Sequence, residues 1–135
     1  MLNIGDTYLH EFVITQAQVN AFAEISGDNN PLHLDEKFAA TTPFKKPIMH
    51  GFLGGSVFSK VLGTIFPGNG TVYLKQNLNF LRPMFVENKY EARFKILEID
   101  TKKNTAIIET QVFDKETGKQ VISGEASVMN KEKFV

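Results

Sequence analysis

The feature that most constrains this chain is an apolar segment at residues 50–66, in which Lys60 is the only charged residue. Apolar side chains recur in it every four positions, as at Leu53, Val57 and Val61, which is the spacing of one face of an α-helix. A helix with so little charge is buried over most of its circumference. It should end at residues 67–70, because Pro-Gly-Asn-Gly does not easily continue a helix.

The second half of the chain changes to the periodicity of β-strands. Apolar and polar residues alternate over residues 72–80 and 90–96, and turn signals separate two further runs at 105–113 and 121–129. Residues 8–14 are expected to add a strand. Turns between such runs are typical of an antiparallel meander. A long buried helix followed by a meander predicts an α+β domain, the hot-dog fold, in which an antiparallel sheet wraps around the central helix.

The first part of the chain is predicted to hold two helices joined by a loop. Thr15 and Gln18 match a capping box, so a helix should begin after Thr15 and end near Gly27. A polar loop is expected at residues 28–34. Asp35 then caps a short helix that runs to residue 40, and residues 41–49, with two prolines, should be irregular.

Bulk composition excludes several classes of protein. The 135 residues fit a single domain spanning 1–135, and 42% of them are apolar. Fifteen basic residues balance fifteen acidic ones, which argues against a nucleic-acid partner. The absence of cysteine excludes disulfides, thiolate metal sites and a cysteine nucleophile. We see no signal peptide and no membrane-spanning segment, so we expect a cytoplasmic protein without a membrane partner.

Candidate chemistry begins with Asp28 and His33, which lie five residues apart with the stiff Pro31 between them. On a curved loop both side chains can converge on one water, which one group deprotonates while the other positions it. Two ordinary roles compete with this reading. An Asp after Ser-Gly often serves only as a turn residue, and a loop histidine is often exposed or satisfied by a structural hydrogen bond.

Gly51 supplies a third element, because it opens the predicted buried helix. A helix N-terminus presents unpaired amide groups and partial positive charge, so the Gly51 amide is a natural donor to a substrate carbonyl. Alternatively, Gly51, Gly54 and Gly55 only allow close packing of helix and sheet, which is the reading we prefer for Gly54 and Gly55. Ser59 either bonds to a carbonyl one turn earlier or orients a loop group.

These residues carry a family resemblance that runs through nearly the whole chain. The segments SGDNNPLHLD at residues 26–35 and PIMHG at residues 47–51 resemble the hydratase-2 motif of MaoC-like proteins. More narrowly, they resemble those of short bacterial R-specific enoyl-CoA hydratases that feed polyhydroxyalkanoate synthesis. The resemblance implies reversible syn hydration of trans-2-enoyl-CoA to (R)-3-hydroxyacyl-CoA by a homodimer.

The resemblance also implies roles for individual residues. Asp28 and His33 match the catalytic pair, and Gly51 matches the residue whose amide polarises the thioester carbonyl. Asn30 matches a position that shapes the loop, and Ser59 matches a serine that supports it.

We also assign Phe52 and Leu62 to the acyl pocket, with plain core packing as the alternative. No metal or redox cofactor is needed, since CoA is part of the substrate. Charge alone suggests partners for the CoA phosphates: Lys45, Lys46, Lys60, Lys75 and Arg82.

Four classes of protein are alternatives to an enoyl-CoA hydratase. Thioesterases and β-hydroxyacyl-carrier dehydratases of the same fold commonly place a carboxylate on the central helix, and residues 50–66 contain none. A MaoC-like (3R)-hydroxyacyl-carrier-protein dehydratase would show the same motif and stays open. A non-catalytic acyl-CoA-binding module would not need the Asp28 and His33 pair.

Overall fold

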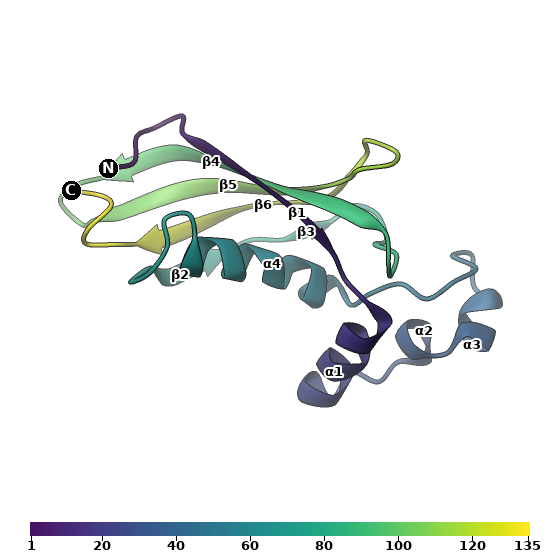
Figure 1. Ribbon diagram of the computed structural model, residues 1–135. Coiled ribbons are helices and arrows are strands. Elements are labelled where there is room, and N and C mark those ends of the chain that lie inside the picture. Colours follow the sequence, from purple (N-terminus) through teal and green to yellow (C-terminus); the bar gives the residue numbers. More distant parts are fainter.

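The computed structural model describes residues 1–135 and contains one antiparallel sheet that curves along helix α4 (Gly51–Thr64) (Figure 1). Five strands run in the order β1-β4-β5-β6-β2, and β3 also pairs with β6. Their bounds are β1 (Thr7–Val13), β2 (Val72–Gln76), β3 (Asn79–Phe80), β4 (Lys89–Asp100), β5 (Thr105–Asp114) and β6 (Gln120–Met129). The predicted α+β hot-dog architecture is therefore confirmed. None of the helices is long and apolar enough to cross a membrane.

The core forms between α4 and the concave face of the sheet. Phe58, Val61 and Leu62 of α4 are fully buried, as the apolar periodicity predicts. Alternate residues of β4 meet them from the sheet, and Phe94 packs edge-on against Phe58 with ring centroids 5.7 Å apart. Helix α4 thus buries one face against the sheet and exposes Ser56, Ser59 and Lys60 on the other, and its N-terminus is available to build a site.

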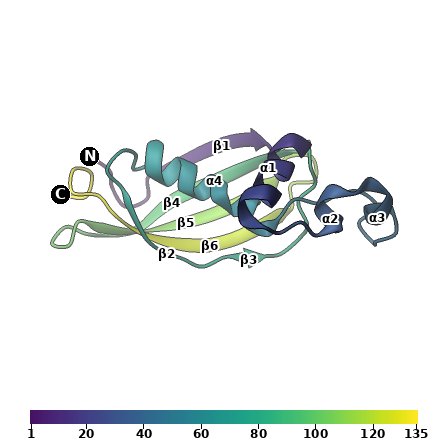
Figure 2. The same cartoon turned by 90° about the horizontal axis from the view of Figure 1, so that it is seen from below.

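Three helices lie at the end of the sheet that is away from both chain termini, and the last two of them extend beyond it (Figures 1 and 2). They are α1 (Gln16–Ser26), α2 (Pro31–Leu34) and α3 (Glu36–Ala40). The capping box of Thr15 and Gln18 is present as predicted, and Gly27 ends α1 in the left-handed conformation at φ 80°. Asp35 caps α3 by accepting hydrogen bonds from two backbone amides, which also confirms the expectation from sequence.

Two local predictions were wrong. The expected continuous strand over residues 72–80 is interrupted after Gln76, and its apolar side chains Val72, Leu74 and Phe80 are between 46% and 49% exposed in the single chain. The reason is topological, because β2 is the last strand of the sheet and has no neighbour on one side. The expected polar loop at 28–34 instead contains α2, whose first residue is Pro31 and whose N-cap is Asn30. Proline suits the first position of a helix, where its missing N–H is not needed.

Candidate active site

Asp28 lies in a tight turn directly after α1. Its amide donates to the Ser26 hydroxyl oxygen at 3.1 Å, and its carboxylate accepts the amide of Asn30 at 3.3 Å. The side chain is exposed to solvent. Gly27 is required here because its positive φ reverses the chain at little steric cost, which directs the next residue back toward the body of the protein.

His33 is held by α2 and by the segment that leads into α4. Asn30 accepts the Leu32 amide at 3.0 Å and so starts the helical turn that carries His33. The His33 ring is buried, and its Nδ1 lies 2.7 Å from the carbonyl oxygen of Ile48. A carbonyl can only accept, so Nδ1 carries the hydrogen and Nε2 of the neutral ring presents a lone pair.

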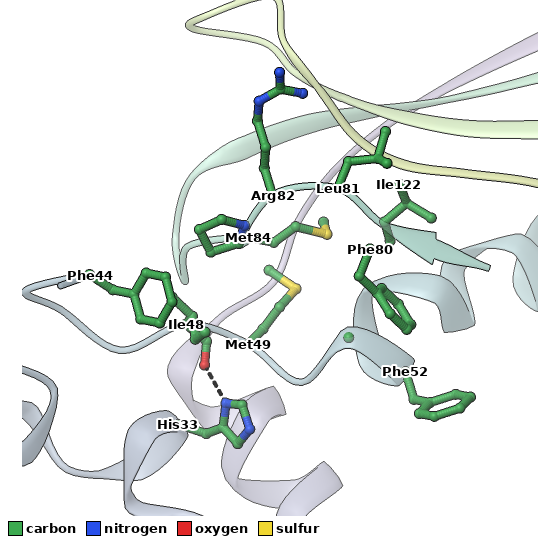
Figure 3. A pocket seen from close by; sticks show the side chains of 12 residues that line it. His33, Phe44, Ile48, Met49, Phe52, Phe80, Leu81, Arg82, Met84 and Ile122 are labelled. Atoms are coloured by element: carbon green, nitrogen blue, oxygen red, sulfur yellow. Dashed lines mark hydrogen bonds between the residues drawn. The ribbon is translucent and has the colours of Figure 1, made fainter. Parts of the chain in front are cut away.

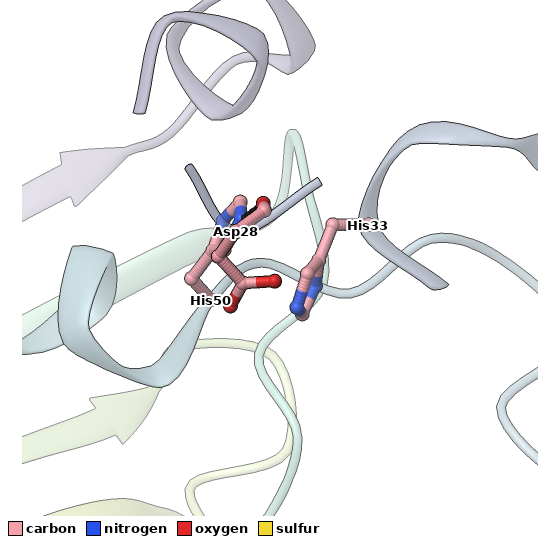
Figure 4. A group of neighbouring side chains, drawn as sticks. All are labelled: Asp28, His33 and His50. Carbon is pink, nitrogen blue, oxygen red and sulfur yellow. Dashed lines mark hydrogen bonds between the residues drawn. The ribbon is translucent and has the colours of Figure 1, made fainter. Parts of the chain in front are cut away.

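The structure brings Asp28 and His33 together, as the sequence predicted. One carboxylate oxygen of Asp28 and one ring nitrogen of each of His33 and His50 lie within 4.8 Å of one another. Figure 4 shows the Asp28 carboxylate pointing toward the His33 ring. Groups at such a separation can share one water at about 2.8 Å from each. Two proton acceptors facing one water can fix its position and remove a proton from it.

Sequence reasoning did not assign a function to His50, which the structure places in this cluster. Its ring stacks on that of His33 with centroids 3.9 Å apart, and its Nε2–H donates to the backbone carbonyl of Asp28 at 2.8 Å. Phe22 packs edge-on against it. The available signal was its place directly before Gly51 in the PIMHG segment, which fixes it at the N-cap of α4.

Gly51 begins α4, where its amide has no partner within the helix and His50 provides no side-chain cap. A Cβ at this position would lie 2.8 Å from the Phe80 ring, so glycine also permits the close approach of that side chain. Both readings of Gly51 from the sequence therefore have a basis in the structure. For Gly54 and Gly55 the packing reading is confirmed, since a Cβ would meet Met84 at 2.7 Å or Leu78 at 3.2 Å.

A cavity of about 420 Å³ opens beside this cluster (Figure 3). His33 and Gly51 both line it, and most of its wall is apolar. The lining residues are His33, Phe44, Ile48, Met49, Gly51, Phe52, Phe80, Leu81, Arg82, Pro83, Met84 and Ile122. Apart from Arg82, which its charge suggested, the sequence assigned no cavity role to the lining residues from the irregular segment 41–49 or from the segment after β3, because their positions carry no periodic pattern. An apolar cavity with few polar groups is typical of a small-molecule site.

The remaining residues singled out from the sequence lie in different places. Phe52 lines the cavity and is 71% exposed in the single chain. Leu62 is fully buried in the core and does not line the cavity, which agrees with the alternative of plain core packing. Ser59 lines a separate depression between α4 and β2, and the hydrogen bonds of the Asp28 turn do not include it. Asn30 has the loop-shaping position that the resemblance implied, since it caps α2.

Of the five basic residues suggested for phosphate binding, only Arg82 lines the cavity. Its guanidinium group donates to the carbonyl of Gln120 at 2.5 Å and is otherwise exposed. Lys46 instead lies over the ring of Phe85, with its Nζ 4.7 Å from the centroid.

The donor atoms of Asp28, His33 and His50 also permit a test for a metal site. Imidazole binds a metal through an in-plane lone pair, and the planes of the two rings are stacked at 30°. Each histidine also uses one ring N–H on a backbone carbonyl. Lone pairs of stacked rings point alongside one another instead of converging on an ion, so the set fits a metal poorly.

The fold and the site together define a class: a hot-dog domain with a carboxylate next to an imidazole that lines an apolar cavity, beside the N-terminus of the central helix. The family model described as "MaoC like domain" matches residues 3–133 of this chain. The chain therefore belongs to the MaoC-like family.

Relatives within the family include hydratases and dehydratases. The chain is 45% identical to the (R)-specific enoyl-CoA hydratase of Aeromonas caviae over 83% of each protein. It is 30% identical to the mitochondrial 3-hydroxyacyl-[acyl-carrier-protein] dehydratase of Arabidopsis thaliana, covering 96% of this chain and 78% of that protein. The solved structure of the (R)-hydratase from A. caviae, involved in PHA biosynthesis, superposes with a TM-score of 0.92 at 40% identity and covers 96% of this chain and 97% of that one.

Proposed function

We propose that this protein is an R-specific enoyl-CoA hydratase, which adds water reversibly to trans-2-enoyl-CoA and forms (R)-3-hydroxyacyl-CoA. The observation that carries the proposal is the convergence of the Asp28 carboxylate and the His33 ring beside the cavity that His33 and Gly51 line. The identity to the A. caviae hydratase over most of both chains supports the same reaction.

The reaction begins with the thioester carbonyl accepting a hydrogen bond from the Gly51 amide. Negative charge that develops on this oxygen is then stabilised by a donor already in place. The acyl chain enters the apolar part of the cavity, which Phe52 borders. Because the double bond is conjugated to the carbonyl, withdrawal of electrons makes C3 electrophilic.

Asp28 and His33 then hold one water over C3. Nε2 of His33 accepts a hydrogen bond from this water, since its Nδ1–H is committed to Ile48. Asp28 takes one proton from the water as the oxygen bonds to C3, and the same proton then passes from Asp28 to C2 on that face with assistance from His33, which restores the carboxylate. Water and proton add from one side because Asp28 and His33, which lie close together, handle both of them, and this gives the syn product. No step requires a metal or a redox cofactor.

Crotonyl-CoA is the substrate that tests this proposal. We expect loss of the enoyl absorbance and formation of 3-hydroxybutyryl-CoA of the R configuration, at a rate that EDTA does not change. Release of free thiol would instead identify a thioesterase. Tight binding of crotonyl-CoA with neither signal would identify a non-catalytic module.

A (3R)-hydroxyacyl-carrier-protein dehydratase is the second candidate, because the A. thaliana relative aligns over nearly the whole chain. Both candidates use the same pair of residues and differ in what carries the thioester. Rates measured with equal concentrations of crotonyl-CoA and of the crotonyl carrier protein distinguish them. We expect the CoA substrate to react faster.

We further propose that the protein is a homodimer formed through strand β2. This edge strand and its surroundings expose large apolar side chains that a second copy would cover: Phe52, Val72, Leu74, Phe80 and Leu81. An exposed apolar edge strand has unpaired backbone groups and can pair with a strand of another chain. Phe52 and Phe80 also line the cavity, so the partner would border it.

In the cell, the (R)-3-hydroxyacyl-CoA product would serve as a monomer for polyhydroxyalkanoate, and we expect a cytoplasmic location. The A. caviae enzyme of similar structure is involved in PHA biosynthesis, which supports this proposal. Arg82, at the cavity wall, is the residue that we propose to meet a phosphate of CoA.

A further inference from the structure

His50 is a buried polar residue that the proposed reaction does not use. It is 3% exposed, lies at the N-cap of α4, and does not line the cavity. We propose that His50 is a positioning residue that holds Asp28, His33 and Gly51 in one arrangement. This inference rests on the proposed function, because it assigns the residue a part in the same reaction.

The first contact fixes Asp28. The other hydrogen bonds of Asp28, with Ser26 and Asn30, reach only two residues along the chain and leave the turn free to move as a unit. The Nε2–H of His50 donates to the Asp28 carbonyl across 22 positions of sequence. It is therefore the contact that ties this exposed turn to the end of the central helix.

The second contact fixes the ring of His33. The hydrogen bond from Nδ1 to Ile48 holds one edge of that ring but leaves it able to tilt about the bond. The His50 ring covers one face of the His33 ring at a centroid distance of 3.9 Å. The Phe22 ring in turn packs edge-on against His50, with centroids 4.9 Å apart. Stacking thus limits the tilt and aims Nε2 of His33 at the shared water.

The third connection is covalent, because His50 directly precedes Gly51. A single residue therefore links all three groups of the site. Nδ1 of His50 is buried and has no hydrogen-bond partner. An unsatisfied buried acceptor destabilises a protein, and its presence beside a functional cluster suggests that the rest of the ring is needed there.

Two substitutions separate the contacts of His50. His50→Phe keeps a stacking ring and removes the hydrogen bond to Asp28, while His50→Gln keeps a donor at a similar reach and removes the ring. We expect each substitution to lower kcat on crotonyl-CoA about tenfold or more, because small displacements of reacting groups slow the chemical step. KM should change less than threefold, because His50 does not touch the substrate. The midpoint of thermal unfolding of His50→Phe should stay close to that of the wild type, since removal of the unsatisfied Nδ1 offsets loss of the hydrogen bond to Asp28.

Val61→Ala is the matched control, because Val61 is fully buried in the same helix and lies outside the site. It should lower the unfolding temperature and leave kcat within about twofold of the wild type. If both His50 variants keep kcat values as high as this control, the proposal is overturned. A loss expressed only in KM would also overturn it, because that would show contact with substrate.

An NMR measurement tests the inference independently of activity. Long-range ¹H–¹⁵N spectra of the wild type should show His33 protonated at Nδ1 and His50 at Nε2, each as one fixed tautomer. In His50→Gln, the His33 signals should shift toward a mixture of tautomers as the ring gains freedom. Unchanged His33 signals in His50→Gln would overturn the positioning role, even if the protein proved to have another activity. A wild-type protein that shows the expected spectra but does not hydrate crotonyl-CoA would contradict only the proposed function.

Discussion

At the scale of single residues, the site depends on two side chains with different surroundings. Asp28 is exposed in a turn, and His33 is buried with one ring nitrogen committed to Ile48. The carboxylate can therefore exchange protons with solvent between turnovers, while the imidazole keeps one orientation. Such a division suits a base and a water-positioning group that act together.

Substitution of either member of this pair should abolish most activity. We expect Asp28→Asn and His33→Gln each to lower kcat by about a hundredfold or more, since each removes a proton acceptor from the shared water. Because the two residues act on one water, the double variant should be little slower than the slower single variant. Near-normal hydration of crotonyl-CoA by either single variant would contradict the assignment. Circular dichroism would confirm that each variant folds.

Glu91 on β4 provides a residue-scale prediction about stability. The Arg93 side chain donates a hydrogen bond to it at 2.8 Å and lowers its pKa; burial opposes this shift, and Lys115 reinforces it. A carboxyl group whose folded pKa lies below its ordinary value of 4.5 stabilises the fold above that pH, and this contribution is lost as the pH falls through the folded pKa.

Glu91→Gln should therefore lower the free energy of unfolding at pH 7 by about 1 kcal/mol, as measured by urea denaturation. The difference from the wild type should shrink below pH 4.5 as the carboxyl group of the wild type becomes protonated. Glu125→Gln is the control, because Glu125 is exposed on β6 and forms no ion pair. An equal gap between Glu91→Gln and the wild type at pH 7 and pH 3 would contradict this explanation.

At the scale of elements, helix α4 has two separate roles. Its middle fills the core, and its first residue faces the cavity. Both ends of the segment were predicted to within two residues, because apolar periodicity and the Pro-Gly run mark them in the sequence. The sequence did not predict α2, since a single turn that starts with proline has no periodic signal.

Gly51→Ala tests the role of the helix N-terminus. The added methyl would lie 2.8 Å from the ring of Phe80, which lines the cavity, so this half-exposed ring must shift and change the cavity wall beside the amide. We expect kcat/KM on crotonyl-CoA to fall about tenfold or more, because the carbonyl no longer reaches the amide in the same geometry.

Gly63→Ala is the matched control in the same helix, since nothing lies within 4 Å of its added Cβ. Alanine favours a helix over glycine, so this variant should gain about 0.5–1 kcal/mol in free energy of unfolding and keep full activity. Equal activity of the two variants would show that the cavity tolerates a methyl group at Gly51.

At the scale of the whole molecule, the two edges of the sheet differ in what borders them. Strand β1 lies at one edge, and β2 lies at the other beside the cavity that Phe52 and Phe80 line. A second copy on the β2 edge would therefore cover apolar surface and border the cavity. Activity and assembly should then depend on the same surface.

Leu74→Lys should dissociate the dimer, because it places a charge on the 48%-exposed apolar edge that the partner would cover. Sedimentation equilibrium should show a monomer, with reduced hydratase activity. Leu9→Lys makes the same change on β1, where Leu9 is 58% exposed, and should leave the assembly unchanged. A wild-type protein that sediments as a monomer would contradict the proposed homodimer.

The sequence by itself determined the fold class, the central helix, the first capping box and the pairing of Asp28 with His33. These features depend on local spacing or on short motifs, which a linear pattern records directly.

Tertiary structure decided the rest. His50 joined the site because the Asp28 turn and the His33 helix fold back onto the start of α4, and Leu62 lies in the core because α4 presents that face to the sheet. The exposure of Val72 and Leu74 follows from the position of β2 at the end of the sheet. Such contacts join residues distant in the chain, so no local pattern encodes them.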